Sequence, residues 1–280
     1  MAGVMMRERR ILVLGPLQVI LDGSATTIGG RVQRALLGRL VLARGQAVSA
    51  GRLIEDIWQG APPRSAGSIL QVQVHNLRHV LEPDRPRRAP ATVLVSESSG
   101  YALRLKTEEV DAWRFEELLR EFEVAARDHR NAPDPDTRLR MMDAALASWR
   151  GSAYESFDDA RWVSAEIARL TDLRLRAIEL RARAALELDR PAEVVIDLRR
   201  AAAEYPDREE TCQLLAIAQY RLGQQAEALA TLRNTRAVLL RELGVDPGPR
   251  LQELETAILT QDPALDRTHG SVFSTSRPRH

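Results

Sequence analysis

The hydrophobic positions of the first hundred residues alternate between the spacing of strands and the spacing of helices. The stretch RILVLGPLQVILDG, which begins at Arg10, predicts two short strands interrupted by Gly15-Pro16 and closed by a turn at Asp22-Gly23. Three segments with helix-spaced apolar residues follow between Arg31 and Glu82, and TVLVSESSGYALRL predicts a second hairpin. Strands, three helices and a hairpin in this order are typical of a winged helix-turn-helix domain.

From about Val110 the apolar positions are almost wholly helix-spaced. Two segments, LDRPAEVVIDLRRA and LGQQAEALATLRNT, align without gaps and place Asp189 against Gly223, an interval of 34 residues. Pro206 stands where a helical hairpin of this period ends its second helix. The interval and the Ala/Leu packing positions resemble tetratricopeptide repeats. Stacked helical pairs of this kind form concave surfaces that bind protein partners.

These patterns predict an α+β winged helix-turn-helix domain followed by an all-α, tetratricopeptide-like domain. We place a flexible N-terminus at 1–9, the winged helix at 10–106 and the helical domain at 107–265. The segment 266–280, rich in Ser, Thr, Arg and Pro, is predicted to be disordered.

The third helix of the first domain, RSAGSILQVQVHNLRHVLE, is apolar on one side and polar on the other. Leu70, Val74, Leu77 and Leu81 fall at helical spacing and form the apolar stripe. The opposite face is predicted to carry hydrogen-bonding and cationic side chains: Arg64, Gln71, Gln73, His75, Asn76, Arg78 and His79. An ordinary solvated helix surface has the same pattern, so the interpretation depends on the surrounding domain.

The charge of the chain is unevenly distributed, although its net value is only +1. Residues 1–106 contain 15 Lys and Arg against 7 Asp and Glu, a net charge of +8, whereas 107–280 carry −7. A basic first domain joined to an acidic second one indicates that the first meets a polyanion. Lys106 is the one lysine among 40 basic residues, and the other 39 are arginine. This bias towards arginine favours an effect of coding composition. The placement of the arginines is therefore better evidence for DNA binding than their number.

The sequence gives no sign of catalysis, of a cofactor or of a metal site. It contains no phosphate-binding loop and no GxSxG, and Cys212, the single cysteine, lies in an apolar helix where a buried thiol is expected. His75 and His79 have the spacing of a helical metal pair, but Asn76 follows the first and no third ligand is apparent. Acidic residues such as Glu55-Asp56 are expected on solvated faces and helix termini. We therefore predict no enzymatic activity.

The N-terminal stretch MRERRILVLGPLQVIL superficially resembles a signal peptide, because positive charge precedes an apolar run. Gly15-Pro16 interrupts that run, which favours a strand, a turn and a second strand. No stretch approaches the roughly 20 apolar residues needed to span a bilayer. We expect a cytoplasmic protein without membrane contact.

Within a winged helix, the third helix offers its polar side to the major groove of double-stranded DNA. Arg34 of the first helix and Ser65 and Ser68 of the third are candidate phosphate contacts, and SESSGY is the candidate wing. For Tyr101 a purely structural role is favoured over a contact with sugar. The complete set of predicted DNA-binding residues is Arg31, Arg34, Arg64, Ser65, Ser68, Gln71, Gln73, His75, Asn76, Arg78, His79, Ser99 and Tyr101.

Motifs spread along the chain resemble the Streptomyces antibiotic regulatory protein family, whose members join an OmpR-type winged helix to a bacterial transcriptional activation domain. The resemblance runs from about Arg10 to Leu265. Its markers are LGPLQV, GGRVQRALLGRLVL, RLIEDIWQGAPPRSAGSILQVQVHNLRHVLE and SGYALRL, then VDAWRFEELL, ALASWRG, RLTDLRLRAIELRARAAL, YRLGQQAEAL and LRELGVDPGPRLQELETAILTQDPAL.

The resemblance implies a transcriptional activator of a biosynthetic gene cluster for a secondary metabolite such as an antibiotic. It implies binding to direct repeats in a promoter as a pair of copies, a homodimer on DNA, and contact with RNA polymerase, including its sigma factor. Direct repeats fit a head-to-tail pair rather than a two-fold dimer.

Four positions depart from the family pattern. Val32 stands where relatives often have lysine. Gly67 and Asn76 stand where basic residues are common, and His75 stands where serine is usual. Fewer fixed cations predict a weaker dependence of binding on salt. Two alternatives stay open: an interaction module whose winged helix has lost DNA binding, and a ligand-responsive repressor.

Overall fold

The computed structural model of the chain describes residues 8–86, 88–127 and 132–266. Most of the predicted flexible N-terminus and all but the first residue of the predicted disordered tail lie outside these ranges. The chain divides into two compact units. The first comprises 1–118 and 147–173, and the second comprises 119–146 and 174–280. We describe each unit by itself; helices α4 (Asp111–Arg127) and α6 (Ser164–Glu187) have residues in both.

The first unit begins with a three-stranded antiparallel sheet. Strand β1 (Arg9–Leu12) pairs with β2 (Gln18–Leu21), and β2 pairs with β3 (Ser24–Thr26). The predicted hairpin of β1 and β2 is confirmed, with Ile11 opposite Val19. The third strand was not predicted, because Ser24-Ala25-Thr26 is too short and polar to show an apolar alternation.

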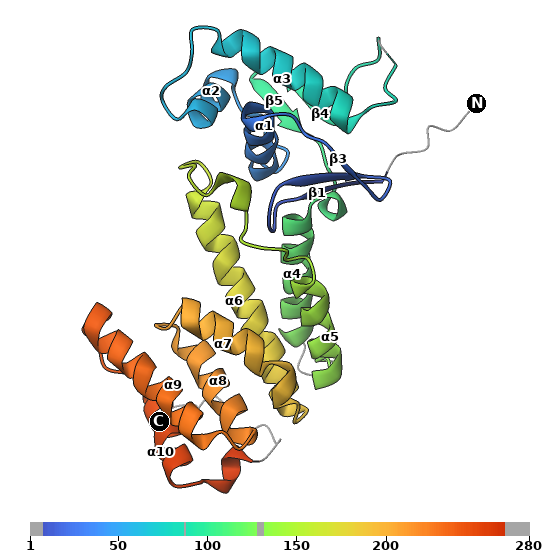
Figure 1. Cartoon of the computed structure of the whole chain (residues 1–280). Coiled ribbons are helices and arrows are strands. Elements are labelled where there is room, and N and C mark those ends of the chain that lie inside the picture. The colour runs from blue at the N-terminus through green and yellow to red at the C-terminus, as the bar shows by residue number, and fades with distance from the viewer. Residues whose placement is uncertain (1–7, 87, 128–131, 267–280) are drawn as a thin grey trace, which may run out of the picture. The chain divides into compact units, whose positions relative to one another are not determined.

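Three helices and a second hairpin complete the winged helix. They are α1 (Arg31–Leu42), α2 (Ala50–Trp58), α3 (Ala66–Leu81), β4 (Leu94–Glu97) and β5 (Gly100–Leu103). Figure 1 shows α3 beside the β4–β5 hairpin. Helices α1 and α2 both pack against α3. The predicted fold class of this domain is confirmed.

Local sequence signals fix where these helices begin and end. The side chain of Ser49 caps α2 by accepting a hydrogen bond from the Arg52 backbone N–H at 3.2 Å, as its position predicts. Gly45 and Gly60 follow α1 and α2 with φ of +82° and +86°, a conformation that glycine adopts without strain. The core between the helices is formed by the predicted apolar stripes, with Leu36, Leu37, Leu40, Leu53, Leu70, Leu77 and Leu81 fully buried.

Asp56 corrects the expectation that this acidic residue faces solvent. It lies on α2 and is only 7% exposed. Its carboxylate accepts hydrogen bonds from Arg39 Nε of α1 at 2.7 Å and from Arg52 Nε at 3.1 Å. A carboxylate taken out of water needs such partners, so Asp56 joins α1 to α2 rather than solvating the surface.

The sheet is bound to the segments that come later in the first unit. Asp111, at the start of α4, accepts hydrogen bonds from the backbone N–H groups of Val13 at 2.8 Å and Leu14 at 3.0 Å. Gly38 of α1 lies close to the aromatic ring of Phe157, where an added Cβ would come within 2.7 Å of a ring carbon. The first unit therefore includes more than the winged helix alone.

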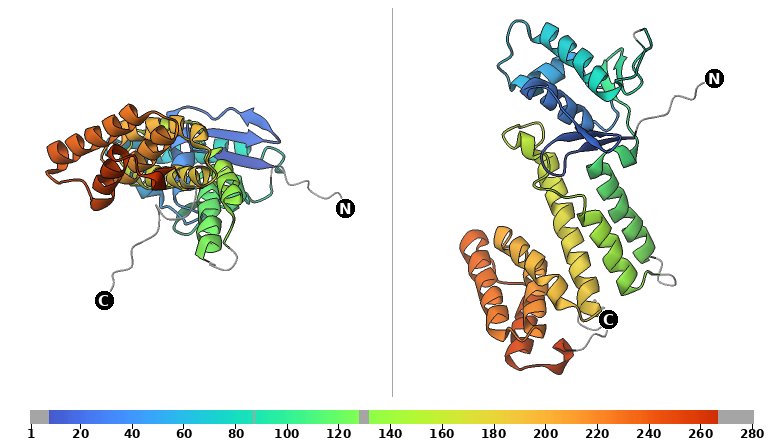
Figure 2. Two further views of the ribbon diagram at one scale, coloured as in Figure 1. Left: turned by 90° about the horizontal axis from the view of Figure 1, so that it is seen from below. Right: turned by 45° about the vertical axis from the view of Figure 1, so that its right-hand side comes forward.

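The second unit is helical throughout its described part. It contains α5 (Pro135–Leu146), α7 (Val195–Glu204), α8 (Glu209–Arg221), α9 (Gln225–Val238) and α10 (Pro249–Leu259), with residues of α4 and α6. Short 3-10 turns at Pro191–Glu193 and Pro263–Leu265 and a π-helical turn at Leu239–Leu243 belong to the same unit; those at Thr107–Glu109 and Glu155–Phe157 belong to the first. Figure 2 shows the helices from two further directions.

The predicted repeat is visible in the turns between these helices. Asp189 after α6 and Gly223 after α8 both have positive φ, +57° and +75°, at the interval of 34 residues found in the sequence. The equivalent residues Val194 and Ala228 are buried, as are Leu198 and Leu232. Helices α7, α8 and α9 pack successively on one another. The tetratricopeptide-like, all-α class of this domain is confirmed.

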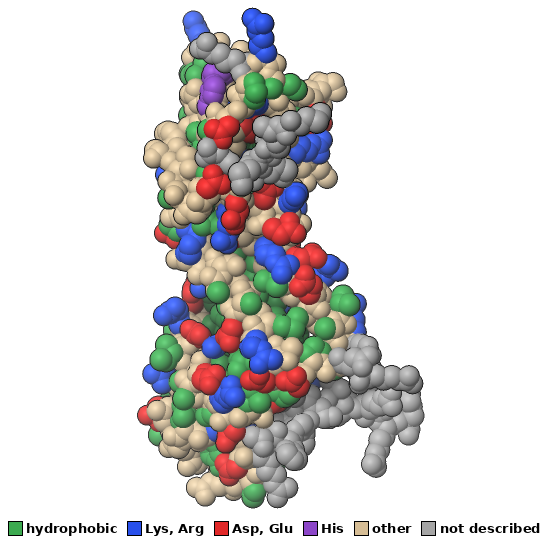
Figure 3. Space-filling view, turned by 90° about the vertical axis from the view of Figure 1, so that its right-hand side faces the viewer, with side chains coloured by type: hydrophobic (Ala, Val, Ile, Leu, Met, Phe, Trp, Pro, Cys, Tyr) green, Lys and Arg blue, Asp and Glu red, His purple; other side chains and the backbone are tan. Residues whose placement is uncertain are grey.

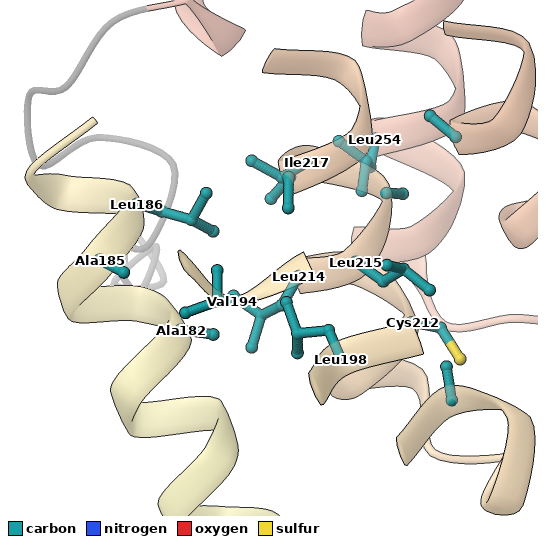
Figure 4. Packing of buried hydrophobic residues seen from close by; sticks show 14 of the residues in the cluster. Ala182, Ala185, Leu186, Val194, Leu198, Cys212, Leu214, Leu215, Ile217 and Leu254 are labelled. Atoms are coloured by element: carbon teal, nitrogen blue, oxygen red, sulfur yellow. The ribbon is translucent and has the colours of Figure 1, made fainter. Parts of the chain in front are cut away.

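The core of the second unit is formed mainly by alanine, leucine, isoleucine and valine side chains of α5 to α10 (Figure 4). The small side chains of Ala182 and Ala185 on α6 are fully buried in this core. Cys212 is buried in this core, as predicted, and burial raises the pKa of its thiol. On the surface, basic and acidic side chains are intermingled (Figure 3), and several form ion pairs, such as that of Arg176 with Glu123 at 3.1 Å.

Candidate nucleic-acid interface

The outer face of α3 is polar over most of its length. Leu70, Val74, Leu77 and Leu81 are buried against the first unit, as their spacing predicts. The residues exposed on the other side include Ser68, Gln71, His75, Asn76 and His79. Because buried leucines hold the helix on one side, these polar groups are presented outward on a rigid element.

Two predicted residues precede this helix. Arg64 and Ser65 follow the double proline and are exposed. Ser65 occupies the capping position, but its hydroxyl caps no helix N–H. The backbone N–H groups of the first turn and the exposed Ser68 hydroxyl thus lie at the positive end of the α3 dipole, a favourable place for an anion.

Gln73 and Arg78 lie at the margin of the polar face and are half-buried. The Arg78 guanidinium donates from Nε to the Leu94 carbonyl at 2.9 Å and from Nη2 to the Ser96 hydroxyl at 2.8 Å. Both acceptors belong to β4, so Arg78 connects α3 to the hairpin. The sequence did not indicate this structural role, because it shows where Arg78 falls on the helix but not which residues of β4 it contacts.

His75 and His79 interact with each other on the exposed face. Their Nε2 atoms are 3.1 Å apart and their rings meet edge to face. Figure 3 shows histidine side chains at the surface. Within the described ranges no group of three His, Cys, Asp or Glu side chains is placed to hold a metal ion.

The β4–β5 hairpin presents the predicted wing. Ser99 is exposed at its turn, and Gly100 has φ of +149° beside the Val48 carbonyl, where an added Cβ would be 2.0 Å from the oxygen. Tyr101 is half-buried, and its backbone exchanges hydrogen bonds with Val48 at 3.0 and 2.9 Å. Only glycine fits at position 100 without moving the wing.

An open hollow of about 660 Å³ lies beside the wing turn. Its lining includes Ser99, the helix cap Ser49 and three arginines, Arg39, Arg44 and Arg52. Each arginine is also paired with a carboxylate: Arg39 and Arg52 with Asp56, and Arg44 with Glu116 and Glu166. The positive charge there is therefore largely compensated.

The two predicted arginines of α1 have partners within the first unit. Arg31 is exposed and forms an ion pair with Asp159 at 3.2 Å. Arg34 is half-buried and donates to the Ser156 hydroxyl at 3.2 Å and to the Leu17 carbonyl at 3.5 Å. The contacts of both residues with DNA stay predictions, as do those of all the residues proposed from the sequence.

One residue on the outer face of α3 was missed. Val72 is 53% exposed although it is aliphatic. Its position two residues after Leu70 places it on the far side of the helix, a signal that the sequence contained. Val72 is absent both from the predicted apolar stripe and from the predicted DNA-binding residues, which were chosen for their polar groups.

Family models match both parts of the chain. A model of the bacterial transcriptional activator domain matches residues 110–259, and one of the C-terminal domain of transcriptional regulatory proteins matches 28–103. The activator-domain match covers more than half of the 280 residues. The chain belongs to the Streptomyces antibiotic regulatory protein family.

Known members of this family are similar over nearly the whole chain. Regulatory protein DnrI of Streptomyces peucetius is 31% identical over 94% of this chain and 96% of its own length. Transcriptional regulator RedD of Streptomyces coelicolor is 32% identical over 91% of this chain and 71% of RedD. Regulatory protein AfsR of the same organism is 37% identical, but the chain spans only about a quarter of its length (26%).

A solved structure of a relative has the same fold. Mycobacterium tuberculosis EmbR, determined in complex with a low-affinity phosphopeptide, superposes with a TM-score of 0.80 at 30% identity. The match covers 93% of this chain and 69% of EmbR. The family that the chain belongs to is one of transcriptional regulators. No described helix has the length and apolarity to cross a membrane.

Proposed function

We propose that this family member activates transcription by binding direct repeats in promoter DNA through α3 and the wing. The observation that supports this most strongly is the exposed row of Ser68, Gln71, His75 and Asn76 on a helix whose other side is fixed by buried leucines. Amide, hydroxyl and imidazole groups hydrogen-bond base edges in the major groove. The genes controlled would be those of a secondary-metabolite cluster.

Phosphate contacts would position the domain on the duplex. The start of α3, with Arg64, Ser65 and Ser68, offers a cation, two hydroxyls and backbone N–H groups. Ser99 on the wing turn would contact the backbone beside the groove. Arg78 would act by holding the wing at β4, in addition to any contact with a base.

The helical domain would supply the contact with RNA polymerase and its sigma factor. Its tetratricopeptide-like helices form the kind of surface that binds proteins. Two copies would bind head to tail on adjacent repeats, as a homodimer formed on DNA. Repeats bound in this way should lie on one face of the duplex, spaced by about 10–10.5 base pairs or a multiple.

The alternative of a protein-docking winged helix has less support. A docking surface on α3 would be marked by a contiguous apolar patch. In the described part of α3, Val72 is the one large hydrophobic residue that is exposed. Ile69 beside it is half-buried, and Ser68, His75 and Asn76 around it are polar.

Footprinting on the promoters beside the gene tests the proposal. We expect protection of two direct repeats by the full chain, and loss of protection when Gln71 and Asn76 are both changed to Ala. Asn234→Ala on α9 is a matched control, because Asn234 is also an exposed helical asparagine. Equal protection by all three proteins would contradict the proposed role of α3.

Activation is tested separately by transcription from such a promoter with purified RNA polymerase. We expect the full chain to increase transcript yield, and insertion of five base pairs between the repeats to abolish the increase. A decrease in transcript caused by the full chain would favour the repressor alternative.

A further inference from the structure

Val72 has a position that distinguishes it from the other exposed apolar residues. Among the described residues, eight large hydrophobic side chains are exposed, and seven of them belong to the second unit. Val72 is the eighth and lies on the second turn of α3. Along α3, the half-buried Ile69 is the one apolar residue that lies one turn from Val72.

Three of the four residues that lie one turn from Val72 on the helix are polar and exposed. Ser68 lies one turn before it, and His75 and Asn76 lie one turn after it. A scattered exposed valine needs no explanation in general. Here, however, the valine stands in the middle of the row that the proposed function places in the major groove.

The major groove offers one apolar group, the 5-methyl group of thymine. A helical valine has one strongly preferred side-chain conformation, so its two methyl groups form a small apolar surface with a fixed direction. Removing the two apolar groups from water together is favourable, and no other base presents an equivalent group there.

We infer that Val72 contacts a thymine methyl group and selects thymine at one position in each repeat. The inference rests on the proposed function and adds a specificity-determining residue to it. The surrounding polar side chains would read hydrogen-bonding edges, whereas Val72 would read the presence of a methyl group.

Replacing thymine by deoxyuridine isolates this contact, because it removes the methyl group and leaves base pairing unchanged. The probe is the promoter fragment bound by the full chain, with each thymine of one repeat replaced in turn. Loss of one buried methyl group should weaken binding by about fourfold. We expect this loss at a single thymine with the unaltered protein.

With Val72→Ala, replacing that thymine by deoxyuridine should no longer weaken binding. The effects of the protein change and of the DNA change on the binding free energy should therefore not add up. Alanine favours the helix and the site is exposed, so this variant should fold; its thermal unfolding is the check. Val124→Ala is the matched control, because Val124 is equally exposed but lies on α4 in the second unit. It should keep the deoxyuridine profile of the unaltered protein.

The possible failures are distinguishable. If Val72→Ala binds with the same deoxyuridine profile as the unaltered protein, the inference is wrong while DNA binding stands. If the unaltered chain binds none of its promoter fragments, the proposed function is wrong and the inference falls with it.

Discussion

At the scale of single residues, the Asp111 carboxylate does more for the first unit than its position at a helix start suggests. It accepts hydrogen bonds from the backbone of Val13, Leu14 and Ala112 and lies 3.8 Å from the Arg150 guanidinium. Burial nevertheless raises the pKa of this carboxyl above its ordinary value near 3.8, because desolvation outweighs those favourable contacts. Asp111 thus completes the hydrogen bonding where the first sheet ends.

Asp111→Ala should destabilise the first unit. The variant leaves the buried N–H groups of Val13 and Leu14 without acceptors, which should lower the free energy of unfolding by about 2–5 kcal/mol. Denaturant unfolding measures the change. Asp159→Ala, which removes an exposed partner of Arg31, is the control and should cost less than about 1 kcal/mol. Similar losses in both variants would contradict the role assigned to Asp111.

The raised pKa adds a pH dependence to the same experiment. The folded state binds the Asp111 proton more tightly than the unfolded chain does. This contribution to stability is therefore full below about pH 3.8 and is lost as pH rises through the folded pKa. Unfolding curves measured across acid pH should show this dependence in the unaltered chain and lack it in Asp111→Ala.

At the scale of elements, α3 and the wing form one assembly because Arg78 joins them. The guanidinium holds β4 at Leu94 and Ser96, and the wing turn is seated against Val48 through Gly100. A helix in the groove and a wing on the backbone need a fixed spacing to engage DNA together.

Arg78→Ala should weaken DNA binding by a similar factor at every base position of the repeat. It should also lower the free energy of unfolding by about 1–3 kcal/mol, because the Leu94 carbonyl and Ser96 hydroxyl lose a charged donor. Binding to single-base variants of the repeat, with thermal unfolding, measures both effects. Arg64→Ala is the control for stability, since Arg64 is exposed and has no described ion pair. A loss confined to one base position would indicate that Arg78 reads a base instead.

The elements themselves were predictable from the sequence to a large extent. Apolar stripes such as Leu70, Val74 and Leu77 indicate which side of a helix is buried. The interval of 34 residues indicates the repeated helical hairpin. The roles of Arg78 and Asp56 were not predictable, because a long side chain chooses partners from elements distant in sequence. Val72 was missed for another reason: the predicted DNA-binding residues were chosen for polar or charged groups, and Val72 has none, although its angular position places it on the exposed side.

At the scale of the whole molecule, the net charge of +8 in residues 1–106 overstates what is available to DNA. Arg9, Arg31, Arg39 and Arg44 are each paired with a carboxylate. Such pairs leave few described cations without a protein partner.

Binding to DNA should therefore depend only moderately on salt. With about three phosphate contacts per copy, the slope of log Kobs against log salt concentration should be roughly −3 per bound copy. Titrations of a promoter fragment between low and physiological salt measure the slope. A slope near −8 would mean that the ion pairs open on DNA and that their arginines bind phosphates.

The central claim is that the outer face of α3 lies in the major groove of promoter repeats. Protection from dimethyl sulfate tests it most directly, since the reagent methylates guanine N7 in the major groove and adenine N3 in the minor groove. The full chain should protect guanine N7 atoms within each repeat, and the variant with Gln71→Ala and Asn76→Ala should not. Protection confined to adenine N3, or no protection in a complex that forms, would contradict the claim.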